Sequence, residues 1–135
     1  MRTQFYSLKL KKNKMQITLT QEESEQFFLT ALCNLDYVCG GYNLTFVYDF
    51  DHYNKVKKPG DCFEDVLMTI LRDGGALGLY DNESDELNKI YIKDVHHGVQ
   101  KMPAQRIINF AAETGDAEDD DVLIQTVFYG EVIFG

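Results

Sequence analysis

The chain has 135 residues, a net charge of −9 and a 44% apolar share, which fits one folded domain and excludes an intrinsically disordered chain. Net negative charge disfavours direct binding of DNA or RNA, because each phosphate contact needs a cation. The sequence contains no run of about 18 apolar residues, which a membrane-spanning helix needs. It therefore predicts a cytoplasmic protein that binds neither nucleic acid nor membrane.

Positive charge is concentrated in residues 1–14, which carry five of the 13 basic residues and no carboxylate. Residues 15–135 therefore hold 22 acidic against 8 basic side chains, a net charge of −14. Two hypotheses stand for residues 1–14: a flexible or strand-like basic arm, or an extension upstream of a natural start at Met15. In both cases we expect residues 15–135 to form a single acidic domain.

The first predicted helix begins at Thr20, which has the spacing of a capping box with Glu23. Apolar residues then recur at helical spacing as far as Leu35, and the double glycine at 40–41 is expected to end the helix. Apolar and polar residues alternate from Leu44 onward. This pattern predicts a strand over 44–51 with one buried face.

A second helix is predicted over 63–71, with Asp61 and Glu64 as its cap pair and the glycines at 74–75 as its end. Residues 76–80 and 90–93 are predicted to be antiparallel strands on either side of a polar loop. The helix and strand order predicts an α+β fold.

The final third is predicted to be mainly helical. Asp94 is expected to cap a segment through Met102, and Pro103 is placed in the first turn of the next helix. Residues 119–121 are expected at the start of the last helix, where carboxylates complement the helix dipole, and this helix is expected to end near Tyr129. The sequence thus predicts a single domain, in which a small, mostly antiparallel sheet is covered by helices.

Three cysteines at positions 33, 39 and 62 form no C-x-x-C pair, which favours neither a disulfide framework nor a zinc site. We expect Cys33 and Cys39 to be buried, reduced thiols.

Two segments resemble short uncharacterised proteins of phages and mobile elements of gut bacteria. They are FEDVLMTILRDGG at 63–75 and VLIQTVFYGEVIFG at 122–135, and the resemblance extends over most of residues 15–135. It implies a role in host-directed interaction or inhibition. It implies no catalytic residue and no cofactor.

The densest charge in the chain is a run of six carboxylates within nine positions, here called the acidic run: Glu113, Asp116, Glu118, Asp119, Asp120 and Asp121. One interpretation is a solvated loop that caps the last helix. The other is a surface that binds a basic protein partner, because complementary potentials steer association. The leading hypothesis is therefore a non-enzymatic acidic binding protein, and the residues ahead of the expected cap are its first candidates.

An alternative hypothesis is a homo-oligomer that binds a small ligand. Aromatic and basic side chains of the middle segment would line its pocket, near Tyr42: Tyr48, Tyr53, Lys55, Lys57 and Lys58. The apolar ending at 132–134 could pack either on a second copy or on the chain's own core.

The weakest alternative is a metal-dependent hydrolase. Asp49 and Asp51 would lie on one face of a strand, with His52 beside them, and could hold a hard divalent cation. The competing interpretation is that all three face solvent where the strand ends.

Overall fold

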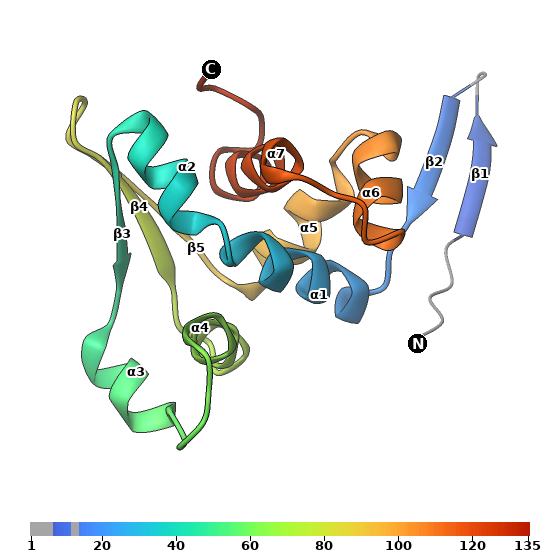
Figure 1. The fold of residues 1–135 in the computed structure, drawn as a ribbon. Coiled ribbons are helices and arrows are strands. Elements are labelled where there is room, and N and C mark those ends of the chain that lie inside the picture. The colour runs from blue at the N-terminus through green and yellow to red at the C-terminus, as the bar shows by residue number, and fades with distance from the viewer. Residues whose placement is uncertain (1–6, 12–13) are drawn as a thin grey trace.

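The computed structural model describes residues 7–11 and 14–135, with side chains from Ile17 onward. These ranges form an α+β fold with two antiparallel sheets and seven helices (Figure 1). One sheet is the hairpin of β1 (Ser7–Lys11) and β2 (Lys14–Thr18). The other contains β3 (Leu44–Tyr48), β4 (Leu77–Asp81) and β5 (Glu86–Ile90) in the order β3-β4-β5.

The helices alternate with these strands and then fill the C-terminal part of the chain. They are α1 (Gln21–Leu32), α2 (Leu35–Tyr42), α3 (Phe50–Val56), α4 (Phe63–Arg72), α5 (Ile92–Gln100), α6 (Ala104–Ala111) and α7 (Ala117–Tyr129). The predicted fold class and the predicted helical C-terminal region are confirmed.

The core lies between one face of the three-stranded sheet and the helices. Side chains alternate across a strand, so Leu44, Leu79 and Ile90 lie on buried positions and belong to the same apolar cluster as Phe28 of α1 and Ile124 of α7. The opposite face is partly open, because Val47 and Leu87 are more than one-third exposed. The helices therefore cover one side of the sheet.

The first predicted helix is two helices. The capping box is confirmed, since the Glu23 N–H donates to Thr20 Oγ1 (3.1 Å) and the Thr20 N–H donates to Glu23 Oε1 (2.8 Å). The prediction that Gly40 and Gly41 end the helix is wrong. Both lie inside α2, and the residue that caps its C-terminal end is Asn43, in the left-handed conformation (φ 55°). Asparagine tolerates that conformation through its short polar side chain.

The predicted strand over 44–51 is too long, because β3 ends at Tyr48 and Asp49 begins α3. The Asp49 carboxylate accepts hydrogen bonds from the N–H groups of Asp51 (2.9 Å) and His52 (3.1 Å). Asp49, which fits the alternating pattern of a strand, is thus a helix cap, and α3 was not predicted.

Helix α4 lies where it was predicted, but Cys62 rather than Asp61 occupies its N-cap, and Asp61 accepts from the Lys58 N–H instead (2.9 Å). Its predicted glycine end is confirmed. The N–H groups of Gly74 and Gly75 donate to the carbonyls of Leu71 (3.0 Å) and Ile70 (2.9 Å), with Gly74 at φ 91°, which is a Schellman motif.

The hairpin after α4 is tighter than predicted. Strand β5 occupies 86–90 instead of 90–93, so that a short turn over 82–85 joins it to β4. Asp94 lies in the first turn of α5 and accepts from the Tyr91 N–H (2.8 Å), so it stabilises the helix start without being the N-cap. Pro103 is the residue just before α6. The predicted end of α7 at Tyr129 is confirmed.

A partly buried carboxylate joins three helices. Glu25 of α1 accepts from Arg72 Nε of α4 (2.6 Å) and faces His96 Nε2 of α5 (2.7 Å). Burial acts to raise the pKa of Glu25, but the hydrogen bonds from His96 and Arg72 outweigh it and hold this pKa below its ordinary value of 4.5. Ionised Glu25 therefore stabilises the folded state.

We expect Glu25→Gln to lower the free energy of unfolding by about 1 kcal/mol at neutral pH, because it removes the charge that both partners face. Since the folded-state pKa is lowered, this contribution is present above pH 4.5 and is lost as the pH falls through the folded value. Urea denaturation between pH 7 and pH 3 measures the difference. Glu22→Gln, at an exposed position of the same helix, is the control, and a difference that did not shrink with falling pH would contradict the assignment.

Candidate functional site

The acidic run forms the start of α7 and the loop before it. Asp116 is the N-cap: its Oδ1 accepts from the Asp119 N–H (3.0 Å), and the Asp116 N–H donates back to Asp119 Oδ2 (3.1 Å). The helix therefore begins earlier than predicted, with the cap at Asp116 rather than at residues 119–121. This reciprocal pair satisfies two N–H groups that the first turn would otherwise leave without partners.

Asp119 and Glu118 both bind Arg106 of α6. The guanidinium donates to Asp119 Oδ1 (2.7 Å) and to Glu118 Oε1 (3.0 Å), and Asn109 donates to Asp119 as well (3.3 Å to Oδ2). Burial acts to raise the pKa of Asp119, but the bonds from Arg106, Asp116 and Asn109 hold it below 3.8. Asp119 is 2% exposed, and its carboxylate is hydrogen-bonded to groups of its own chain.

Asp120 is also buried, but its environment differs from that of Asp119. Asn34 Nδ2 donates to it, and no cation is hydrogen-bonded to it among the described residues. Burial raises the pKa of Asp120, and the charges of Asp119 and Asp116 raise it further, while the Asn34 bond acts in the opposite direction. The ionised form of Asp120 is therefore held in the folded protein at a cost.

Asp121 is linked to the C-terminal segment through Tyr42 and Gln125. It accepts from Tyr42 Oη and from Gln125 Nε2 (2.7 Å), and the bond to Asp121, followed by burial, raises the pKa of Tyr42 to about 12. Gln125 Oε1 in turn accepts from the N–H groups of Ile133 and Phe134 (2.8 Å each). The ring of Phe134 stacks on Tyr42 (5.1 Å between centroids), so part of the apolar ending packs on its own chain, while Val132 and Ile133 stay about half exposed.

Glu113 ends α6 in an unusual backbone conformation. Its φ is 58°, its N–H donates to the Phe110 carbonyl (3.2 Å), and the Thr114 N–H donates to the Asn109 carbonyl (2.9 Å). This is the left-handed position of a Schellman motif, which glycine occupies most often. Its side chain is exposed, and it has no hydrogen bond or ion pair within the described part of the chain.

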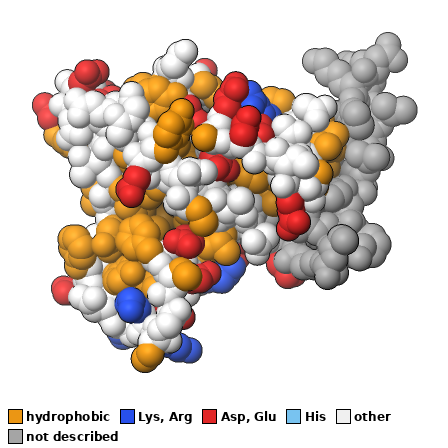
Figure 2. Space-filling model, viewed as in Figure 1, with side chains coloured by type: hydrophobic (Ala, Val, Ile, Leu, Met, Phe, Trp, Pro, Cys, Tyr) orange, Lys and Arg blue, Asp and Glu red, His pale blue; other side chains and the backbone are white. Residues whose placement is uncertain are grey.

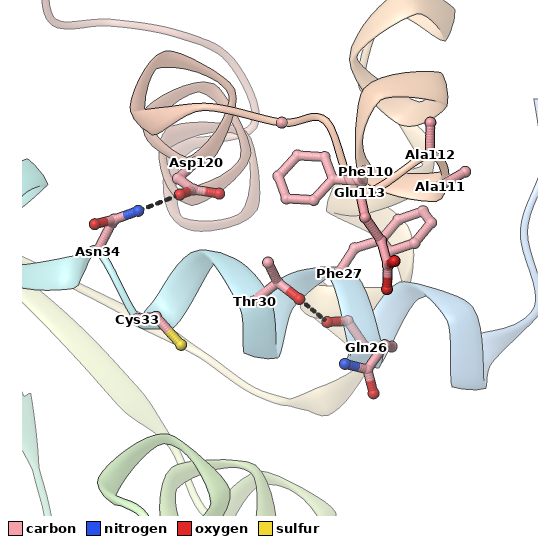
Figure 3. Close-up of a pocket in the computed structure, with 11 residues that line it drawn as sticks. Gln26, Phe27, Thr30, Cys33, Asn34, Phe110, Ala111, Ala112, Glu113 and Asp120 are labelled. Atoms are coloured by element: carbon pink, nitrogen blue, oxygen red, sulfur yellow. Dashed lines mark hydrogen bonds between the residues drawn. The ribbon is translucent and has the colours of Figure 1, made fainter. Parts of the chain in front are cut away.

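Glu113 and Asp120 line one groove, of about 860 Å³, between α1, the end of α6 and the start of α7. In Figure 3 the Glu113 side chain extends toward α1 at one end, and Asp120 faces Asn34 at the other. The lining residues are Gln26, Phe27, Thr30, Cys33, Asn34, Phe110, Ala111, Ala112, Glu113, Gly115 and Asp120. They include two carboxylates and no lysine or arginine.

Aromatic rings form the buried wall of this groove. Phe27 of α1 and Phe110 of α6 stack with their centroids 5.5 Å apart, and both are buried.

Cys33, which was expected to be buried, is exposed at the groove. Burial and the nearby Glu64 raise the pKa of the Cys33 thiol, which disfavours a reactive thiolate. Carboxylates beside apolar rings suit a cationic side chain with an aliphatic stem.

The aromatic residues of the predicted ligand pocket pack against one another in the structure. Tyr48 and Tyr53 contact each other (5.3 Å between centroids) and both contact Phe63 (5.5 and 5.8 Å). The three lysines at 55, 57 and 58 are exposed at the end of α3, and Figure 2 shows basic side chains beside an apolar patch at the lower left. Tyr42 contacts Phe134 and Asp121 instead.

The three metal candidates do not converge. Asp49 caps α3, and the ring of His52 faces Asp73 at the end of α4 (Nε2 to Oδ2, 2.7 Å). Because β3 ends before Asp49, Asp49 and Asp51 do not share a strand face as predicted. Within residues 7–11 and 14–135, no three His, Cys, Asp or Glu side chains are grouped so that they could hold a metal ion.

Comparison with models of known protein families, with curated proteins and with solved structures finds no match. Among the described helices, none is long and apolar enough to cross a membrane.

Proposed function

We propose that this protein is a non-enzymatic binding protein that holds a basic side chain of a protein partner in the groove between α1, α6 and α7. The observation that carries the proposal is that two carboxylates, Glu113 and Asp120, line the same groove and that each is held there at a cost in stability. The resemblance noted above would make the partner a host or viral protein, and the protein an accessory factor or inhibitor.

The backbone of Glu113 supplies the first part of the argument. Three other described helices also end in the left-handed conformation, and their residues there are Asn43, Gly74 and Gly130. A residue such as glutamate costs about 1 kcal/mol or more in that conformation. A strained residue at a groove is a reason to infer function, and here its carboxylate supplies charge at the groove.

The burial of Asp120 supplies the second part. The neighbouring Asp119 is paired with the positive charge of Arg106. Asp120 instead accepts a hydrogen bond from a neutral amide and lies near two negative charges. A bound guanidinium or ammonium group would supply the missing positive charge. Charge-assisted hydrogen bonds of this kind are about twice as strong as neutral ones.

The wider surface favours the same class of partner. Residues 15–135 carry a net charge of −14, so a basic segment is attracted from a distance and its association weakens with salt. The exposed Glu118 and Asp116 lie beside the groove in sequence, and we assign them to this steering role.

We expect Asp120→Asn and Glu113→Gly each to weaken binding of a basic probe at least 10-fold without loss of stability. The amide introduced by Asp120→Asn would keep the bond from Asn34, and glycine would relieve the strain at position 113. The probe is a blocked peptide of alternating arginine and glycine, titrated into the ¹⁵N-labelled protein and followed by NMR. Amide shifts around Thr30, Glu113 and Asp120 are expected, and they should weaken between 0.05 and 0.5 M salt.

Two matched controls separate the site from general effects. Glu131→Gln removes an exposed charge at the other end of α7, and Asn43→Gly makes the same backbone change at a helix end outside the groove. Neither should change the affinity. Shifts spread evenly over the surface, or an Asp120→Asn variant that binds as Glu131→Gln does, would refute the proposed site.

A further inference from the structure

The groove between α1, α6 and α7 is larger than one side chain needs. Its volume of about 860 Å³ is near the upper end of the range of pockets that enclose a drug-sized molecule, about 300 to 1,000 Å³. A groove of this size holds a peptide segment of several residues. The proposed function requires one basic side chain there, and the arrangement of charge along the groove indicates what else the segment carries.

The two groove carboxylates belong to different ends of the groove. The Glu113 N–H donates to the Phe110 carbonyl, and the ring of Phe110 stacks on Phe27 of α1. Asp120 accepts from Asn34, which is seven residues after Phe27. Seven helical residues span about 10 Å, and Figure 3 shows the two carboxylates over different parts of α1. An ion pair needs a contact of about 4 Å, so one cationic group does not reach both in this arrangement.

A helix ends beside each of these carboxylates. Helix α1 has its C-cap at Cys33 and α6 at Ala112, and both residues line the groove. The C-terminal end of a helix carries partial negative charge, which a basic side chain in the last turn complements. Neither helix has a basic residue there. The start of α7 is the opposite, positive end of a helix, and it is capped by Asp116 with Asp119 in its first turn.

We propose that the partner segment carries two basic side chains three residues apart, one for Glu113 and one for Asp120. This proposal rests on the proposed function, because it concerns the same groove. An extended chain advances about 3.1 to 3.4 Å per residue, so three residues match the separation of about 10 Å. In the polyproline II conformation, residues three apart also lie on the same face. The apolar lining, including Phe27 and Phe110, would contact the aliphatic stems of the two side chains.

The test compares three blocked peptides by titration calorimetry with the full chain. In the polyproline II conformation, Arg-Pro-Pro-Arg holds its arginines about 9 Å apart and Arg-Pro-Pro-Pro-Pro-Pro-Arg about 19 Å apart, while Ala-Pro-Pro-Arg has a single arginine. The short dibasic peptide should bind at least 10-fold more tightly than either of the others, because the second contact forms at a high effective concentration. The two dibasic peptides carry the same charge, so long-range attraction alone cannot produce this preference.

Glu113→Gly and Asp120→Asn should each reduce the preference for the short dibasic peptide over the single-arginine peptide to about twofold, because one contact is lost. Glu131→Gln, an exposed charge at the other end of α7, is the matched control and should keep the full preference. Circular dichroism checks that all three variants fold.

Two results with the wild-type protein would overturn the two-cation proposal and leave the proposed function intact. They are equal binding of the short dibasic and single-arginine peptides, and equal binding of the two dibasic peptides. A preference that survives in either groove variant would overturn it as well. Absence of binding by all three peptides also overturns it, and the peptide of alternating arginine and glycine then shows whether the proposed function fails with it.

Discussion

Replacing Asp119 with alanine should lower the free energy of unfolding by about 3 kcal/mol, which is within the range for removing one partner of a buried ion pair. The carboxylate is 2% exposed and accepts hydrogen bonds from Arg106, Asn109 and the Asp116 N–H. Alanine would leave a partly buried guanidinium without its main partner. It would also remove the half of the α7 capping box in which Asp119 accepts from the Asp116 N–H.

Urea denaturation at neutral pH measures the loss, and pH identifies its cause. The pKa of Asp119 is lowered, so its contribution is present above the ordinary value of 3.8 and is lost as the pH falls through the folded value. Asp120→Asn, at the neighbouring position, is the control, and its change in the free energy of unfolding should have the opposite sign. Because the pKa of Asp120 is raised, this variant should gain stability at neutral pH, and the gain should vanish as the pH falls to 3.8. Equal losses in both variants would contradict this division of roles.

Gly98→Ala should lower the free energy of unfolding by about 2 to 3 kcal/mol, as overpacking of a tight core does. A Cβ at position 98 would lie 2.8 Å from the Val127 Cα and 3.1 Å from its Cγ2. The nearest atom belongs to the backbone of α7, so no side-chain rotation relieves the contact. Helices α5 and α7 would have to move apart.

Gly40→Ala is the control for this variant. Gly40 lies inside α2, and a Cβ there would meet no atom within 4 Å. Alanine is favoured over glycine in a helix by about 1 kcal/mol, so Gly40→Ala should stabilise the protein by up to that amount. Thermal unfolding of the two variants compares them directly, and a Gly98→Ala protein as stable as wild type would mean that α5 and α7 are less closely packed than described.

The fold was predictable where local rules act alone. The capping box at Thr20 and the glycine end of α4 depend on residues within one turn. Prediction failed where a residue type has two uses. Asp49 fits the alternating pattern of a strand but caps a helix. Gly40 is a residue type that often ends helices but lies within α2. In both cases the structure around the residue, rather than its local preference, decided its conformation.

The candidate site was only partly predictable. Glu113 and Asp120 belong to the acidic run, which the charge pattern singles out. The pattern could not separate them from Asp119, because the difference arises from Arg106 and Asn34, at sequence separations of 13 and 86. The ring pair of Phe27 and Phe110 joins two helices that are far apart in the sequence, and no local pattern connects them. The sequence identified the charge, and tertiary packing determines which carboxylates are paired with a cation of the same chain.

The left-handed helix end at Glu113 has a consequence for how this chain changes under selection. Selection for folding alone would replace this residue with glycine, the residue that already ends α4 and α7 in the same conformation. A laboratory evolution experiment that rewards heat resistance alone would therefore be expected to lose Glu113 early. Under the proposed function, retention of Glu113 in a lineage would record selection for recognition, so position 113 would distinguish variants selected for folding alone from variants that also bind a partner.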